Sequence, residues 1–99
     1  MLKAAFIFIA PEADSQKHCA VVETPVVSLT VVGVKDYSAA EKAAKLLVEQ
    51  GIAAIELCGG FGVEGVSRVK KAAGGNVAIG VVRFDIHPGL GNKSGDEIF

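Results

Sequence analysis

The chain has 99 residues, of which 51% are hydrophobic, and ten basic and eleven acidic side chains give it a formal net charge of −1. This length fits one domain, 1–99. A near-neutral chain without a basic patch excludes nucleic acid as the expected partner. No apolar run reaches the ~18–20 residues that span a bilayer, so we expect no membrane partner.

Two features of the composition bear on assembly and location. Mean hydropathy is +0.44, which is high for a small monomer with a hydrated surface. We therefore expect a homo-oligomer in which self-association covers apolar surface. The two cysteines, Cys19 and Cys58, do not make a disulfide framework, so a cytoplasmic protein with reduced thiols is expected.

The first segments predict a strand and a long polar loop. Ala4–Ile9 is apolar with aromatic and β-branched residues, and we read it as a buried strand. The polar stretch 11–24 predicts a loop, with a short extended piece at Ala20–Val22 as an option. The charged, histidine and cysteine side chains of this loop are Glu12, Asp14, Lys17, His18, Cys19 and Glu23.

A second strand and the clearest helix follow. Pro25–Val34 is strongly β-branched and predicts a strand. Ser38–Gln50 predicts a helix, in which Ser38 and Glu41 have the spacing of a capping box and Gly51 is a C-terminal cap. The charged residues of this helix form one narrow stripe, so we expect the sheet and a neighbouring subunit to cover the rest.

A glycine turn links the next strand to the second helix. Ala53–Leu57 is nearly all apolar, which predicts a central strand covered on both faces. Gly59, Gly60 and Gly62 follow, and Val63–Ala73 has helical spacing of its apolar residues. Unpaired N–H groups at the start of this helix are suited to an anion.

The turn also fits a dinucleotide fingerprint in spacing alone. Gly60-x-Gly62-x-x-Gly65 follows a predicted strand, and Asp85 lies twenty residues further on. The chain is short for a doubly wound domain, and Glu64 would repel a phosphate. Two interpretations stay open: a tight corner in which Gly65 lets the helix pack close to the sheet, or a site for an anion or phosphorylated small molecule.

The remaining segments complete the predicted fold. Val77–Arg83 predicts the last strand, and 84–99 is a C-terminal arm without periodicity, either frayed or docked on a neighbour. Right-handed crossovers make the helix-linked strands parallel. We predict an α/β single-domain sandwich with a mainly parallel four-stranded sheet in the order β-β-α-β-α-β. The orientation of the first strand, and whether the arm crosses between subunits, stay open.

Polar side chains gather where the parallel strands end, the usual ligand edge of such sheets. We expect Glu56 or Asp85 to act as acid or base, His87 as proton shuttle, and Arg83 with the glycine turn as anion holder. Cys58 precedes a helix N-terminus and is a candidate nucleophile. The structural alternative is a Glu56–Arg83 ion pair beside an inert Cys58. Cys58 with His87 or Asp85 is a metal-binding alternative that no spacing supports, and the sequence leaves any cofactor unknown.

The following segments carry a family resemblance: AFIFIAP, TVVGV, AIELCGGFG, GVVRFD and HPGLGNKSGD. Through these segments the whole chain resembles a family of short prokaryotic proteins, the domain of unknown function numbered 6506. The resemblance implies kinship but no activity, and it transfers no catalytic residue.

Two functions remain as hypotheses from the sequence. The first is a cytoplasmic homo-oligomer that binds a small anionic metabolite near Gly59–Gly62 and Arg83–His87, as a binding protein or an enzyme. The second is a structural or assembly protein without a small-molecule site, in which the arm after Phe84 builds the oligomer.

Overall fold

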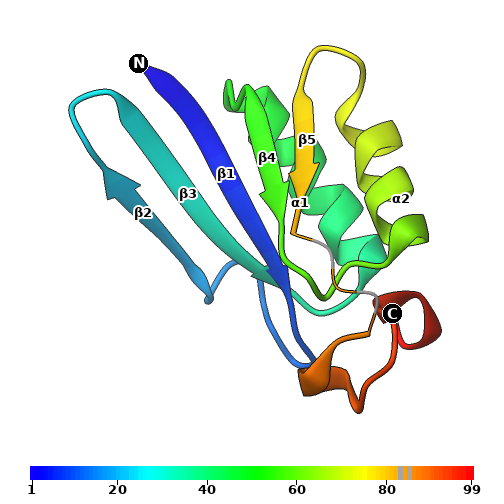
Figure 1. Ribbon diagram of the computed structural model, residues 1–99. Helices are drawn as coiled ribbons and strands as arrows, with labels where there is room; N and C mark the ends of the chain where they lie inside the picture. The colour runs from blue at the N-terminus through cyan, green and yellow to red at the C-terminus, as the bar shows by residue number, and fades with distance from the viewer. Residues whose placement is uncertain (83, 85) are drawn as a thin grey trace.

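The computed structural model describes residues 1–82, 84 and 86–99. It contains a sheet, two α-helices and two short 3-10 helices (Figure 1). The elements are β1 (Leu2–Ile9), β2 (Cys19–Glu23), β3 (Val27–Val34), α1 (Tyr37–Glu49), β4 (Ala54–Leu57), α2 (Val63–Ala73), β5 (Ala78–Val81), η1 (Pro88–Leu90) and η2 (Gly95–Glu97).

The sheet has five strands in the order β2-β3-β1-β4-β5. Strands β3, β1, β4 and β5 are parallel, and β2 pairs with β3 antiparallel. The α/β class and the mainly parallel sheet are confirmed, but the count of four strands is wrong. The extended piece at Ala20–Val22 is part of a full strand, β2. A tight turn at Thr24 reverses the chain after β2, so that β3 runs back beside it and pairs with it.

The first strand, whose orientation the sequence left open, lies in the middle of the sheet. It runs parallel to both β3 and β4. The segment predicted as the central strand, β4, instead lies between β1 and β5. The crossover from β3 to β4 therefore passes over β1. This explains why β1, the most apolar segment of the chain, has other strands on both sides.

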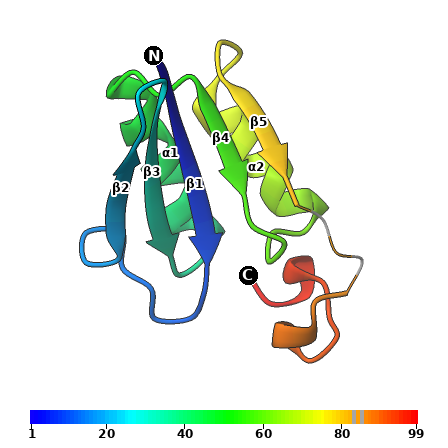
Figure 2. The same cartoon turned by 60° about the vertical axis from the view of Figure 1, so that its left-hand side comes forward.

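Both α-helices cover the same face of the sheet, as Figure 2 shows. The crossovers β3-α1-β4 and β4-α2-β5 step across the sheet in one direction, and right-handed crossovers place both helices on one side. The core lies between these two layers. Its largest fully buried side chains are Phe61, Ile7, Ile55, Leu57, Val34 and Val69.

The other face of the sheet is covered by no described element. In β4, Ile55 and Leu57 are fully buried against the helices, whereas Glu56 is exposed on the opposite face. The expectation of a strand covered on both faces is therefore wrong. An exposed Glu56 keeps its hydration and needs no buried partner.

Helix α1 begins one residue earlier than expected and is capped differently. Asp36 is the N-cap, and its side chain accepts a hydrogen bond of 2.8 Å from the backbone N–H of Ala39. Ser38 already lies in the first turn, so the capping box with Glu41 is wrong. The Glu41 carboxylate instead accepts two hydrogen bonds from Arg68 of α2, at 3.0 and 3.1 Å.

The C-terminal arm folds back onto its own chain rather than extending away. Residues 95–99 lie beside the start of α2, where the red end of the chain is seen in Figure 1. Within the described residues, no helix is long and apolar enough to cross a bilayer.

Candidate functional site

The carboxyl ends of the four parallel strands meet at one edge of the sheet, at the lower end in Figures 1 and 2. Three segments crowd this edge: the loop between β1 and β2, the glycine turn after β4, and the C-terminal arm. Because ligands of open α/β sheets bind at this edge, each segment is a candidate site.

The start of α2 already holds a carboxylate, that of Asp96 in the arm. Asp96 Oδ1 accepts hydrogen bonds from the backbone N–H groups of Glu64 (3.1 Å) and Gly65 (3.4 Å). It also accepts from the Tyr37 hydroxyl at 3.0 Å, and that hydroxyl in turn accepts from the backbone N–H of Gly62 at 2.9 Å. The first turn of α2 thus binds an anion, which the chain itself supplies.

The other glycines of the turn are covered in the same way. A Cβ added at Gly59 would overlap the Phe84 ring, and one added at Gly95 of the arm would overlap the carbonyl oxygen of Gly60. Phe84 also meets the His87 ring edge to face, with 5.1 Å between centroids. Close approach of the backbone to an arm, rather than to a bound ligand, explains why these positions carry glycine.

Tyr37 is the residue that joins the arm to both helices. The residue is 3% exposed, and its ring stacks on Phe61 with centroids 5.7 Å apart and meets Phe99 at 6.1 Å. The Arg68 guanidinium lies 5.7 Å from the ring centroid, within cation–π range. Burial, helped by the nearby Asp96 carboxylate, raises the pKa of Tyr37 to about 12, so the phenol stays neutral and donates to Asp96.

Cys58 lies at the end of β4 and is half-buried. Its Sγ accepts hydrogen bonds from the backbone N–H groups of Ile9 and Gly60, both at 3.4 Å. The sulfur therefore satisfies two backbone donors where β1 and β4 end. Its role as nucleophile stays a prediction.

The other two candidate catalytic residues that the structure describes, Glu56 and His87, lie on different elements. Glu56 is exposed on the face of the sheet away from the helices. His87 caps η1, and its Nδ1 accepts a hydrogen bond of 2.9 Å from the backbone N–H of Gly89. Arg83 and Asp85 lie outside the described residues, so their proposed roles stay predictions.

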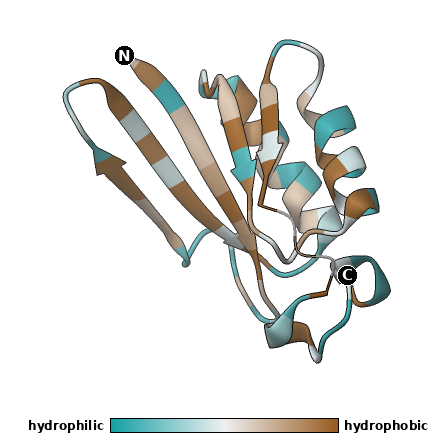
Figure 3. Ribbon diagram, in the orientation of Figure 1, coloured by the Kyte–Doolittle hydropathy of each residue, from teal (hydrophilic) through white to brown (hydrophobic). Residues whose placement is uncertain are grey.

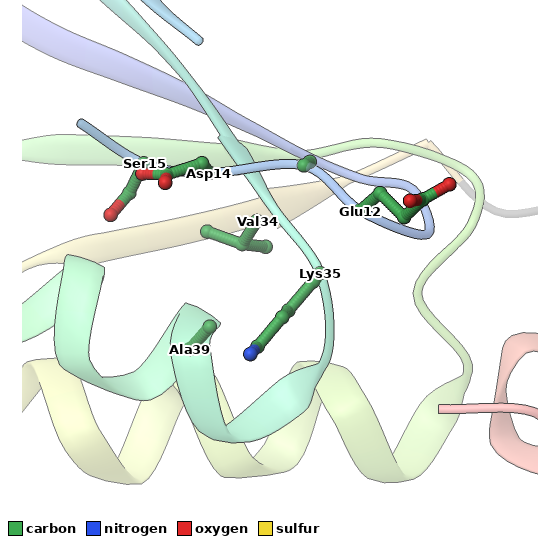
Figure 4. A pocket seen from close by; sticks show the side chains of 7 residues that line it. Glu12, Asp14, Ser15, Val34, Lys35 and Ala39 are labelled. Atoms are coloured by element: carbon green, nitrogen blue, oxygen red, sulfur yellow. The ribbon is translucent and has the colours of Figure 1, made fainter. Parts of the chain in front are cut away.

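An open pocket of about 540 Å³ lies at the carboxyl edge of the sheet, beside β1 and β3 rather than beside the glycine turn after β4. It is formed by the loop after β1, the end of β3 and the first turn of α1 (Figure 4). Its lining residues are Glu12, Ala13, Asp14, Ser15, Val34, Lys35 and Ala39.

Local hydrogen bonds fix the loop that forms one wall of this pocket. The backbone N–H of Asp14 donates to His18 Nδ1 at 2.9 Å, and Asp14 Oδ1 accepts from the backbone N–H of Gln16 at 2.8 Å. The hydrogen bond from Gln16 lowers the pKa of Asp14. Glu12 has a left-handed backbone with φ of 64°, which turns the chain sharply after Pro11.

Sequence reasoning missed the partners that cover the glycine turn. Asp96 and Tyr37 are far from that turn in the sequence, and no local pattern connects them with it. One signal was available: Ser94 and Glu97 have the spacing of a capping box, and both of its hydrogen bonds form in η2. This motif indicates an ordered turn in the arm, though not where that turn docks.

Within the described part of the chain, no group of three or more histidine, cysteine, aspartate or glutamate side chains is arranged to hold a metal ion. Neither the curated proteins nor the solved structures contain a match to this sequence. A family model does match residues 2–97, nearly the whole chain. The chain therefore belongs to the family of unknown function DUF6506.

Proposed function

We propose that this chain is a cytoplasmic, homo-oligomeric protein that binds a small anionic metabolite at the carboxyl edge of its parallel strands. The observation that carries the proposal is the pocket of about 540 Å³ beside Lys35. Its volume falls in the range of small-molecule sites, and its place beyond β1 and β3 is the ligand edge of this fold class.

Lys35 supplies the positive charge that an anionic ligand requires. Among the described residues, the one ion pair joins Arg68 and Glu41, so the Lys35 ammonium is not neutralised by a carboxylate contact. In Figure 4 its side chain runs toward Ala39 in the first turn of α1. The start of α1 adds no free positive end, because the N-cap carboxylate of Asp36 already accepts from the Ala39 N–H, so the positive charge offered to a ligand is that of Lys35.

The remaining lining groups define which anion fits. The Ser15 hydroxyl can donate to an oxyanion. The carboxylates of Glu12 and Asp14 accept hydrogen bonds but repel negative charge, so the ligand must place donors near them. A small carboxylate or phosphate ester that also bears hydroxyl or amino groups satisfies both walls.

The glycine turn is a weaker position for this ligand. Its N–H donors at Glu64 and Gly65 are taken by Asp96, and an incoming anion would have to displace that carboxylate. We therefore place the ligand at Lys35 and not at Gly59–Gly62.

Native mass spectrometry of the purified protein, followed by denaturing release, tests this function. We expect a stoichiometric small mass on the wild type, and its loss in Lys35→Gln. Lys42→Gln is the matched control, because Lys42 is exposed on α1 away from the pocket lining. Retention of the mass by Lys35→Gln, or its loss in both variants, would rule out this pocket.

The alternative is a structural or assembly protein without a small-molecule site. The observation that favours it is the uncovered apolar face of the sheet, on which a second copy can pack. The arm is a weaker candidate for the clasp, because Asp96 and Phe99 contact their own chain. A bare protein that assembles normally, and whose assembly survives deletion of residues 90–99, would favour the sheet face over the arm.

A further inference from the structure

The sheet has one face that no described element covers, and we call it the open sheet face. It is defined by Phe6, Phe8, Val22, Leu29, Val31 and Glu56. Cross-strand partners share a face, and the pairs Phe6–Val31, Val22–Leu29 and Phe6–Glu56 connect these residues across four strands. Figure 2 shows the open sheet face toward the viewer, with α1 and α2 behind it.

The open sheet face is apolar where a solvated face should be polar. Every outward residue of β1, β2 and β3 is apolar, and Figure 3 shows brown over most of these strands. The polar strand residues Lys3, Ser28 and Thr30 point to the helix side instead. A sheet with one solvated face normally has an apolar inner face and a polar outer face. Here both faces carry apolar side chains, since Ile7 and Val34 on the helix side are fully buried as well, and the apolar outer face indicates that it is covered in the working protein.

The exposed area of the single chain supports the same conclusion. Its accessible surface is 5793 Å² for a mass of 10.2 kDa, whereas a folded monomer of that mass exposes roughly 5,300 Å². Strands of 8, 5, 8, 4 and 4 residues cover a flat area of about 460 Å² at the usual rise and spacing. The single chain therefore exposes more surface than a compact monomer of its mass, and Leu2 and Val22 contribute to it from the open sheet face, at 47% and 56% exposure.

We infer that a second copy of this chain packs on the open sheet face, to form a two-fold dimer of sheet against sheet. The inference rests on the self-association in the proposed function and is independent of the pocket at Lys35. Two such faces stack at about 10 Å with their side chains interdigitated. The Phe8 ring lies against Gly33, where a Cβ would overlap it, so the glycine makes room for this ring within the open sheet face.

The charge of the open sheet face favours a second copy of this chain over a lipid surface as its partner. Among the described residues of the strands, its one charged side chain is Glu56, which is acidic. A bilayer surface attracts cationic side chains, and the face offers none. A two-fold axis over the β1–β3 pair leaves Glu56, on β4, at the border of the contact, where water still reaches its carboxylate.

The area also predicts how tight the dimer is. The flat value of about 460 Å² counts all five strands, so a contact centred on β1 and β3 covers only part of it, whereas a standard interface buries ~800 Å² per partner. The dimer is therefore at the small end of specific interfaces, and we expect it to dissociate on dilution.

Sedimentation velocity over a range of concentrations tests the inference with matched variants. Val22 and Val21 are neighbours in β2, are 56% and 55% exposed, and lie on opposite faces of the sheet. We expect Val22→Lys to raise the dimer dissociation constant at least tenfold and Val21→Lys to leave it within twofold. Leu29→Lys and Thr30→Lys repeat the comparison nearer the centre of the sheet, with circular dichroism to check the fold.

The possible outcomes separate the two proposals. A wild type that stays at 10.2 kDa at every concentration overturns self-association itself. A dimer that neither Val22→Lys nor Leu29→Lys weakens, or that the helix-side lysines weaken as much, overturns the open sheet face as the interface. Dissociation by the open-face lysines alone supports it.

Discussion

The Asp96 carboxylate makes the sharpest prediction about stability. Replacing Asp96 by alanine removes the acceptor for two backbone N–H groups of α2 and for the Tyr37 hydroxyl. Loss of a capping acceptor costs about 1 kcal/mol, a hydrogen bond to a charged group ~1.5 kcal/mol, and loss of negative charge at a helix start about 0.5 kcal/mol. We therefore expect Asp96→Ala to lower the free energy of unfolding by roughly 2–3 kcal/mol.

Urea denaturation followed by circular dichroism measures this loss. In a domain of this size, 1 kcal/mol corresponds to about 4–8 °C in Tm, so a thermal melt should shift by roughly 10–20 °C. Asp96→Asn keeps an oxygen acceptor and loses the charge, and we expect it to cost about 1 kcal/mol. Glu49→Ala, at an exposed position near the end of α1, is the control and should change stability by less than ~0.5 kcal/mol.

A double-mutant cycle with Tyr37→Phe isolates the contact between the two side chains. If the phenol and the carboxylate interact as the 3.0 Å distance indicates, the double variant should lose about 1 kcal/mol less than the sum of the single losses. Additive losses, or an Asp96→Ala variant as stable as the wild type, would refute the reasoning that the arm is held at the start of α2.

Three further predictions concern the same region. Gly62→Ala should destabilise by about 1–3 kcal/mol in urea denaturation, because the new methyl group overlaps the arm's carboxylate, whereas Gly75→Ala meets no atom and should be tolerated. Tyr37 is the one tyrosine of a chain without tryptophan, so tyrosinate absorbance should show a pKa near 12 and not near 10. Because the pKa is raised in the folded state, the stability that comes with the neutral phenol is complete below pH ~10 and is lost as the pH rises through 12. Hydrogen bonds from Arg68 lower the pKa of Glu41. The stability that these bonds provide is complete above pH ~4.3 and is lost as the pH falls through the lowered pKa. Glu41→Gln should therefore remove this acid dependence from the unfolding free energy.

The sequence predicted the elements whose signal is local. β1, β3, β4, β5 and both α-helices lie within a few residues of the expected segments, because apolar runs and helical spacing reflect burial against neighbours along the chain. The sequence predicts only part of β2, because this strand lacks the signal of burial. All five residues of Cys19–Glu23 are exposed, so the strand is held by edge hydrogen bonds to β3 rather than by a buried face.

The preference of the α2 N-terminus for an anion could be read from the sequence, but the identity of the anion could not. Glycines before a helix indicate free N–H groups wherever they occur. Asp96 is 31 and 32 residues from the groups that it binds, and the arm that carries it also contacts Tyr37 through the Phe99 ring. Such a contact is set by tertiary packing and leaves no periodic signal.

The pocket at Lys35 was hidden for a similar reason. Its walls come from three separate segments: the loop after β1, the end of β3 and the start of α1. The loop has no periodicity, and its form depends on the hydrogen bond between the Asp14 backbone and His18. Lys35 directly follows β3, and that it forms no ion pair with another described residue is a property of the folded chain.

The two halves of the sheet differ in what they leave available to other molecules. On the β4–α2 side, the arm occupies the glycine turn and satisfies the donors that a ligand would need. On the β1–β3 side, the pocket stays open and the outward face stays apolar. β3 serves both features, because Leu29 and Val31 belong to the open sheet face while Val34, in the same strand, lines the pocket. A partner on the open sheet face and a ligand beside Lys35 would therefore meet opposite faces of the same strand, and the two kinds of binding can be measured separately.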